Sequence, residues 1–324
     1  MPETSAGQAT APLELGREYV PEGEDAAIEK LRTGHLKIQE PHHRGEHPKH
    51  HAGLWATFTV EADVPEALRA GLFAKPGDYT AFVRFSNGRT FDDREPDVHA
   101  IAVKVLIPGQ GEQDFLLADH PVFFAENVER ILEFLMLSLT GAAPPVLVAK
   151  YPKLIGFKNH AQGSMLGMSY WSQTPYRLGA AAVKYYAVPS AGRAQSVIPL
   201  NDSKDCLREA LTEQLTARKM GAKFDFCVIP QTDAGAMPVE DPTIEWTSPP
   251  VKLATIAIYP QKFDSAEQMT FVENTTWSPW HSLPEHAPIG GINRARRMVY
   301  LDSQALRHKT NGVASAAFTG REWF

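Results

Sequence analysis

The stretch TAFVRFSNG at residues 80–88 decides the fold, together with the two segments that follow it, VHAIAVKVLIP at 98–108 and QDFLLAD at 113–119. Each segment is rich in β-branched and aromatic residues and is followed by turn-forming residues, which is typical of a β-strand. The connections between them are short. Such a series favours an antiparallel barrel or meander.

Other strands and several helices are predicted on either side of this stretch. The further strands are WATFTV at 55–60, VKYYAVP at 183–189, KFDFCVIPQ at 223–231 and VKLATIAIYP at 251–260. Apolar periodicity and capping residues predict helices over 24–36, 66–73, 127–139, 201–221 and 294–308. The sequence therefore predicts an α+β protein with a flexible N-terminal arm over 1–24 and a single domain over 25–324.

Composition excludes several classes of protein. The chain has 324 residues, with 32 Lys and Arg against 38 Asp and Glu, so its formal charge is −6. This balance argues against a nucleic-acid binder, which needs a basic face. The sequence has no apolar run of the ~18 residues that a membrane span needs, and its N-terminus does not resemble a secretory signal. With only two cysteines, a reduced cytoplasmic setting is expected.

Histidines are concentrated in PHHRGEHPKHHAG at residues 41–53. Clustered histidines can bind zinc, but Pro48 interrupts any helix that would align them, and no cysteine or carboxylate spacing supports a site. Two interpretations stay open: a metal-binding module, and a polar loop with one functional histidine or none. The five candidates are His42, His43, His47, His50 and His51.

A pair of residues near the C-terminus indicates a different chemistry. Arg296 and Tyr300 are four residues apart in RRMVY, and on a helix that spacing places both on one face. A guanidinium beside a phenol favours the ionised phenolate. The pair becomes informative only in combination with other motifs.

Together, these motifs resemble those of the haem catalase superfamily, in the same order along residues 40 to 310. The matching segments are Arg44-x-x-His47-x-Lys49, VRFSNG at 83–88, DVHAIAVKV at 97–105, PVFF at 121–124, the helix at 202–211, FDFCVIPQT at 224–232, EQMTF at 267–271 and Arg296-x-x-x-Tyr300-x-Asp302.

The resemblance implies a catalase-like antiparallel β-barrel core with surrounding helices. Only 24 residues follow Tyr300, so we expect a minimal form that lacks the family's long arm and C-terminal domain. It is similar to the small catalase-related haem proteins, which include peroxidases and allene oxide synthases. No NADPH site is predicted. A homodimer is expected only by analogy with the family.

The resemblance also implies haem b, with Tyr300 as the proximal iron ligand and Arg296 keeping that phenol ionised. A phenolate is a hard anionic donor that suits ferric iron. His47 is expected to act as the distal acid–base in cleavage of the peroxide O–O bond. Ser86 is expected to orient His47 by a hydrogen bond.

Four more residues match cofactor contacts, and one departs from the family. Arg44, Arg84 and Arg307 are expected to pair with the haem propionates, and Phe134 to line the distal side. Asp119 stands where we align the family's asparagine. An ionised aspartate only accepts hydrogen bonds, which disfavours fast H2O2 disproportionation.

We therefore expect a haem-dependent enzyme that cleaves peroxide O–O bonds, a peroxidase with weak catalase activity on H2O2 or organic hydroperoxides. The first alternative is an allene oxide synthase-like isomerase of fatty-acid or secondary-metabolite hydroperoxides. The second is a non-catalytic haem-binding protein. The reaction product distinguishes the two enzymes.

Overall fold

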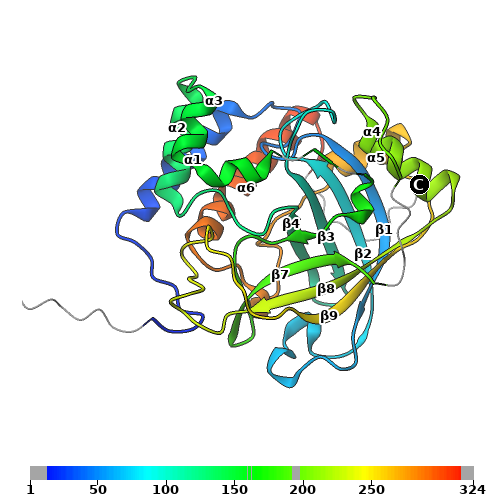
Figure 1. The fold of residues 1–324 in the computed structure, drawn as a ribbon, viewed down its shortest axis with the longest axis horizontal. Helices are drawn as coiled ribbons and strands as arrows, with labels where there is room; N and C mark the ends of the chain where they lie inside the picture. The colour runs from blue at the N-terminus through cyan, green and yellow to red at the C-terminus, as the bar shows by residue number, and fades with distance from the viewer. Residues whose placement is uncertain (1–12, 159, 162, 192–197, 315–324) are drawn as a thin grey trace, which may run out of the picture.

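A single antiparallel sheet, closed into a barrel, forms the centre of the molecule (Figure 1). The computed structural model describes residues 13–158, 160–161, 163–191 and 198–314. The strand order is β5-β4-β3-β2-β1-β9-β8-β7-β6, and an additional pairing between β5 and β7 closes the ring. The strands are β1 His50–Val60, β2 Gly77–Asn87, β3 His99–Ile107, β4 Gly111–Ala118, β5 Tyr170–Trp171, β6 Tyr176–Leu178, β7 Ala181–Pro189, β8 Ala222–Pro230 and β9 Val251–Ile258.

Helices surround the barrel, which confirms the predicted α+β class. In Figure 1, α1, α2 and α3 lie at one side of the barrel, and α4 and α5 lie at the other. No helix in the described part of the chain has the length and apolar character needed to cross a membrane. The α-helices are α1 Glu24–Ile38, α2 Val128–Leu139, α3 Pro144–Lys150, α4 Cys206–Thr212, α5 Ala266–Asn274 and α6 Gly291–Asn311.

Two of the predicted helices were wrong in detail. The segment 66–73 forms two separate 3₁₀ turns, because Gly71, the first residue of the second turn, adopts a positive φ of 49° that a regular helix does not allow. The segment 201–221 becomes helical only at Cys206, and its last turn is a π-helix over Glu213–Ala217.

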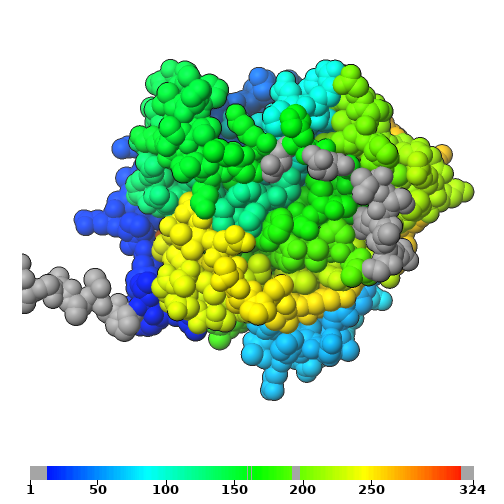
Figure 2. Space-filling model, in the orientation of Figure 1, coloured from blue at the N-terminus to red at the C-terminus, as the bar shows by residue number. Residues whose placement is uncertain are grey.

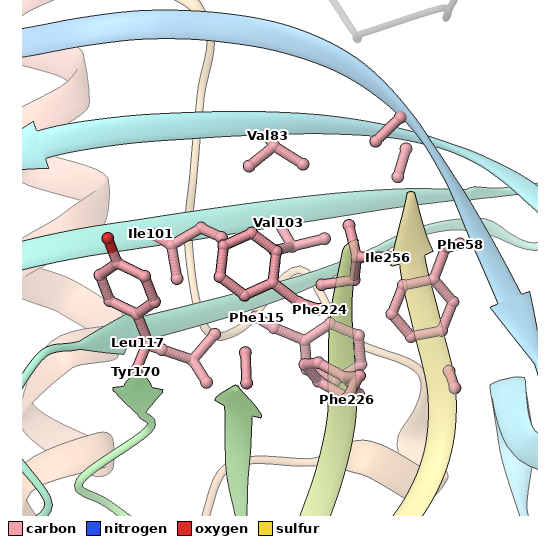
Figure 3. Close-up of a cluster of buried hydrophobic side chains, with 14 of the residues drawn as sticks. Phe58, Val83, Ile101, Val103, Phe115, Leu117, Tyr170, Phe224, Phe226 and Ile256 are labelled. Atoms are coloured by element: carbon pink, nitrogen blue, oxygen red, sulfur yellow. The ribbon is translucent and has the colours of Figure 1, made fainter. Parts of the chain in front are cut away.

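Aromatic rings fill the inside of the barrel, as Figure 3 shows. Phe115 packs against Phe226 and Tyr185 at ring-centroid distances of 4.7 Å each, and Phe58 packs against Phe226 at 5.2 Å. These side chains are at most 2% exposed. The barrel interior is therefore a packed core, and a ligand site must lie outside it.

The N-terminal segment contacts the body of the molecule near the start of α6. Arg294 forms ion pairs of 2.6, 2.6 and 2.8 Å with Glu18, Glu24 and Glu240. Gly16 N–H also donates to Gln231. Residues 13–23 of the predicted flexible arm thus have defined contacts, while residues 1–12 lie outside the described residues.

Strand β1 begins earlier than predicted, and its first residues contain a bulge. His50 is paired with Ser86, whereas Ala52 is paired with Phe85, so the register shifts at His51. A β-bulge of this kind adds one residue to a strand and bends it. The chain therefore reaches His47 at the end of the barrel, directly before β1.

Candidate active site

A cavity of about 760 Å³ lies between the barrel and helices α1, α2 and α6. It brings together residues that are up to 276 positions apart in the sequence, from Leu31 to Arg307. Of the predicted site residues, only Asp119 is absent from its lining. The lining contains Arg44, His47, Arg84, Ser86, Phe134, Arg296, Tyr300 and Arg307.

Arg296 and Tyr300 are in direct contact on α6. Arg296 Nη2 donates to the Tyr300 hydroxyl at 3.0 Å, and the guanidinium carbon lies 5.2 Å from the centre of the Tyr300 ring. Burial lowers the pKa of Arg296, but Tyr300 and Tyr176 outweigh this effect and raise it overall. Arg296 thus remains a cation at neutral pH, placed to stabilise negative charge on the Tyr300 oxygen.

His47 is held by the backbone at the end of β2. Its N–H donates to Gly88 O at 2.8 Å, and its Nδ1 lies 3.0 Å from Asn87 O. A carbonyl only accepts, so we assign the ring proton to Nδ1, which leaves a free electron pair on Nε2. Burial and the charge on Arg84 lower the pKa of His47. A neutral imidazole of this tautomer is a general base.

The hydrogen bond expected between Ser86 and His47 is replaced by another arrangement. Arg84, two residues before Ser86 on the same strand face, donates from Nη1 to Ser86 Oγ at 2.9 Å. Arg84 Nη2 donates to His47 O at 2.6 Å. The carbonyl of Asn87 performs the orienting role that the sequence assigned to Ser86.

The other histidines of the 41–53 cluster contact different partners. His42 Nδ1 lies 2.9 Å from Asn311 Oδ1, His50 Nε2 lies 3.1 Å from Met269 O, and His51 Nε2 lies 2.8 Å from Asn87 Oδ1.

Within the described ranges, the one side-chain group suited to a metal is Glu112, Asp114 and His281, which includes no histidine of the cluster. Lys104 Nζ already lies 2.7 Å from Glu112 and 2.8 Å from Asp114. The structure thus places no metal-ligand group at residues 41–53.

Three buried arginines form a cluster with unsatisfied hydrogen-bond donors. The Nε atoms of Arg44, Arg84 and Arg307 are buried and have no partner among the described residues. The nearest carboxylate is Glu273, whose Oε1 lies 4.0 Å from Arg307 Nε. Burial lowers the pKa of all three guanidinium groups. The cluster is therefore suited to a ligand that carries carboxylates.

Asp119 lies outside the cavity wall. Its carboxylate accepts from His99 N at 2.9 Å and lies 2.8 Å from His99 Nδ1. Successive residues of a strand point to opposite faces, so the preceding residue, Ala118, lines the cavity instead. The Asp119 carboxylate thus faces His99, and the cavity wall carries a methyl group at this place.

Aromatic side chains form much of the remaining wall. Phe134 packs on Phe124 at a ring-centroid distance of 4.8 Å, and Phe124 packs on Phe123 at 4.6 Å. All three line the cavity, so Phe123 and Phe124 of the PVFF segment belong to its wall together with Phe134. Trp277 lines it too, and its buried Nε1 has no partner among the described residues.

Sequence reasoning did not identify Asn87, Trp277 and Glu273 as site residues. Asn87 is part of the VRFSNG motif, and its position directly after Ser86 was a usable indication that it belongs to the site. Glu273 lies on α5, two residues after the EQMTF motif, which was a usable indication, and Trp277 lies just after that helix.

Comparisons with known proteins agree with this architecture. No protein-family model and no curated protein sequence matches the chain. Solved structures do match it, with TM-scores of 0.66 for a fungal catalase, 0.68 for a bacterial catalase and 0.64 for catalase A from Saccharomyces cerevisiae. The identities are 16%, 18% and 17%, and the alignments cover 93%, 95% and 93% of this chain.

The chain spans about two thirds of the length of these proteins, at 66%, 67% and 68%. The overall fold is therefore shared with these structures. The protein has a catalase-like fold in a short form.

Proposed function

We propose that the protein is a haem-dependent enzyme that cleaves the O–O bond of H2O2 or of organic hydroperoxides. The observation that carries this proposal is the single cavity with the Arg296–Tyr300 pair, the Nε2 electron pair of His47 and the cluster of three arginines. No other group of described residues brings together a general base, a phenol that can serve as an anionic ligand, and hydrogen-bond donors for the carboxylates of a ligand.

The residues present fit haem b. Tyr300 would be the iron ligand, and Arg296 Nη2 would keep its oxygen anionic. The unpartnered Nε atoms of Arg44, Arg84 and Arg307 would hold the two propionates. Haem, when bound, supplies the redox-active iron for peroxide cleavage.

His47 supplies the proton transfers. Its neutral Nε2 takes a proton from the peroxide and returns a proton to the departing oxygen, which makes that oxygen a better leaving group. Asn87 O, at 3.0 Å from Nδ1, stabilises the imidazolium that exists between the two transfers. The lowered pKa of His47 keeps the base form available below neutral pH.

A second candidate is a hydroperoxide isomerase that acts on apolar substrates. Ala118 offers no hydrogen bond to H2O2, and the wall around Phe123, Phe124 and Phe134 is apolar. These features favour a bulky organic hydroperoxide over H2O2.

An absorption spectrum of protein produced with ample haem precursor, followed by addition of peroxide, tests the proposal. Tyr300→Phe should lose or strongly weaken haem binding, while His47→Ala should retain haem and lose turnover. His42→Ala, an exposed histidine of the same segment, is the control.

Retention of an unchanged haem spectrum in Tyr300→Phe would refute the ligand, and full turnover by His47→Ala would refute the base. Haem binding without turnover of any peroxide by the wild type would leave the non-catalytic alternative. Oxidised donor or rearranged hydroperoxide as product separates the two enzymatic candidates.

A further inference from the structure

A strip of exposed apolar side chains lies on the surface next to the cavity. Met136 and Leu139 at the end of α2, Val146 on α3, and Ile155 in the following 3₁₀ turn are 50%, 40%, 54% and 64% exposed. The strip thus holds four of the twelve large apolar residues that are exposed in the described chain. We call it the α2–α3 patch. Clustered exposure of this kind marks an interaction surface.

The part of the patch that follows α2 is also basic. Residues 143–158, APPVLVAKYPKLIGFK, contain three lysines and no acid, in a chain of net charge −6. Lys150 is paired with Glu133 of α2. Lys153 and Lys158 are exposed and form no ion pair with a described residue. The patch therefore offers positive charge beside apolar side chains, which complements an anionic, partly apolar partner.

The other side of the same segment forms the wall of the cavity. Leu147 and Leu154 line the cavity, and each is next in sequence to an exposed residue, Val146 and Ile155. Figure 2 shows this part of the chain in green at the molecular surface. A ligand released from a partner bound at this surface would therefore have to cross only the side chains of this segment to enter the cavity.

We propose that the α2–α3 patch docks on an anionic lipid membrane. A short amphipathic segment with exposed aliphatic residues and lysines, and without acids, binds in the plane of the lipid interface. A second copy of the chain is a poorer partner, because a two-fold contact would place the lysines of both patches against each other. The consequence for the substrate rests on the proposed function: the cavity would then receive apolar hydroperoxides from the bilayer.

Co-sedimentation of the full-length protein with vesicles tests the docking without any use of haem or peroxide. The probes are vesicles of phosphatidylcholine alone and of phosphatidylcholine mixed with phosphatidylglycerol. We expect binding to the anionic vesicles, weakened by high salt. Val146→Glu/Ile155→Glu should reduce it by roughly tenfold or more, and Lys153→Glu/Lys158→Glu by about fivefold or more for each lysine.

A matched control carries the same charge change at exposed apolar residues elsewhere. Tyr259 and Leu301 are 56% and 51% exposed, and Tyr259→Glu/Leu301→Glu should bind vesicles like the wild type. Circular dichroism verifies that each variant is folded. The proposal is overturned if the wild type does not bind, or if the control loses as much binding as Val146→Glu/Ile155→Glu.

Self-association of the wild type that these patch substitutions abolish, without vesicle binding, would assign the surface to a second copy and also overturn the proposal. Haem binding and peroxide turnover are measured separately on the same preparations. Failure of the docking therefore leaves the proposed function intact, and failure of the function leaves the docking result valid.

Discussion

Replacement of Arg307 by methionine should stabilise the protein without haem and weaken its affinity for haem. Arg307 is 2% exposed, its Nε has no partner among the described residues, and the carboxylate of Glu273 is 4.0 Å away. Burial, reinforced by the charge of Arg44, lowers the pKa of Arg307 to about 9. The guanidinium is thus a buried cation without adequate compensation in the ligand-free fold.

The magnitude follows from that pKa. The lowering of the Arg307 pKa from its ordinary value to about 9 corresponds to about 5 kcal/mol against the charged form in the folded state, at about 1.36 kcal/mol per pH unit. Methionine retains much of the side chain's apolar volume and removes the charge. Because surrounding groups relax, we expect a gain of about 2–4 kcal/mol in the free energy of unfolding.

Urea denaturation of haem-free protein and haem titration by absorbance measure the two effects. The loss of one charge-assisted hydrogen bond to a carboxylate should weaken haem binding by roughly 10- to 100-fold. Arg218→Met is the control, because Arg218 is 46% exposed and pairs with Glu213 at the surface. A haem-free Arg307→Met that is less stable than wild type, or that binds haem equally well, would refute the reasoning.

Three further predictions concern pH and substrate preference. Because burial lowers the pKa of His47, kcat/KM should fall on the acid side with a midpoint below about 6.5; a midpoint above that value in a pH–rate profile contradicts the assignment. Burial lowers the pKa of His286 to about 4, so below about pH 6.5 the unfolded state binds more protons and stability falls. In urea titrations, the free energy of unfolding should fall by about 3 kcal/mol less in His286→Gln than in the wild type between pH 7 and pH 4. Equal falls in the two proteins would exclude His286 as the cause. Ala118→Asn adds an amide donor to the cavity wall and should increase oxygen release from H2O2 relative to organic hydroperoxide turnover, as oxygen-electrode assays can show; an unchanged ratio argues against this position.

Much of the barrel was predictable from local sequence. The content of β-branched and aromatic residues in TAFVRFSNG and its neighbours, with the turn-forming residues after them, identified β2, β3 and β4 nearly to their ends. Closure of the ring was not predictable, since it depends on the pairing of the two-residue strand β5 with β7. A strand that short has no periodicity to detect.

The sequence predicted which residues line the site better than it predicted the hydrogen bonds between them. Motif positions identified His47, Tyr300 and the three arginines, all of which line the cavity. Ser86 was expected to bond to His47 because the sequence does not show that Ser86 Oγ accepts a hydrogen bond from Arg84 instead. Asp119 lies outside the cavity and Ala118, the residue before it, lines it, because a step of one residue along a strand exchanges the two faces.

Asn87 connects His47 to a buried hydrogen-bond network at the end of β2. The Asn87 carbonyl lies 3.0 Å from His47 Nδ1, and its Oδ1 lies 2.8 Å from His51 Nε2. Its Nδ2 donates to Asp93 at 2.9 Å, and Asp93 is paired with the buried Lys49 at 2.6 Å.

His47 itself is in a left-handed conformation, with φ 56°, which a non-glycine residue adopts only where its surroundings enforce it. The Lys49–Asp93–Asn87 network fixes the end of β2, to which His47 is hydrogen-bonded. The segment before His47 is also bonded to α6, because Gly45 N–H donates to Ser303 Oγ at 3.3 Å and Asn311 Nδ2 donates to His42 O at 3.2 Å. The helix that carries Tyr300 thus contributes to the position of His47, so substitutions at these α6 contacts should alter the geometry around His47 as well.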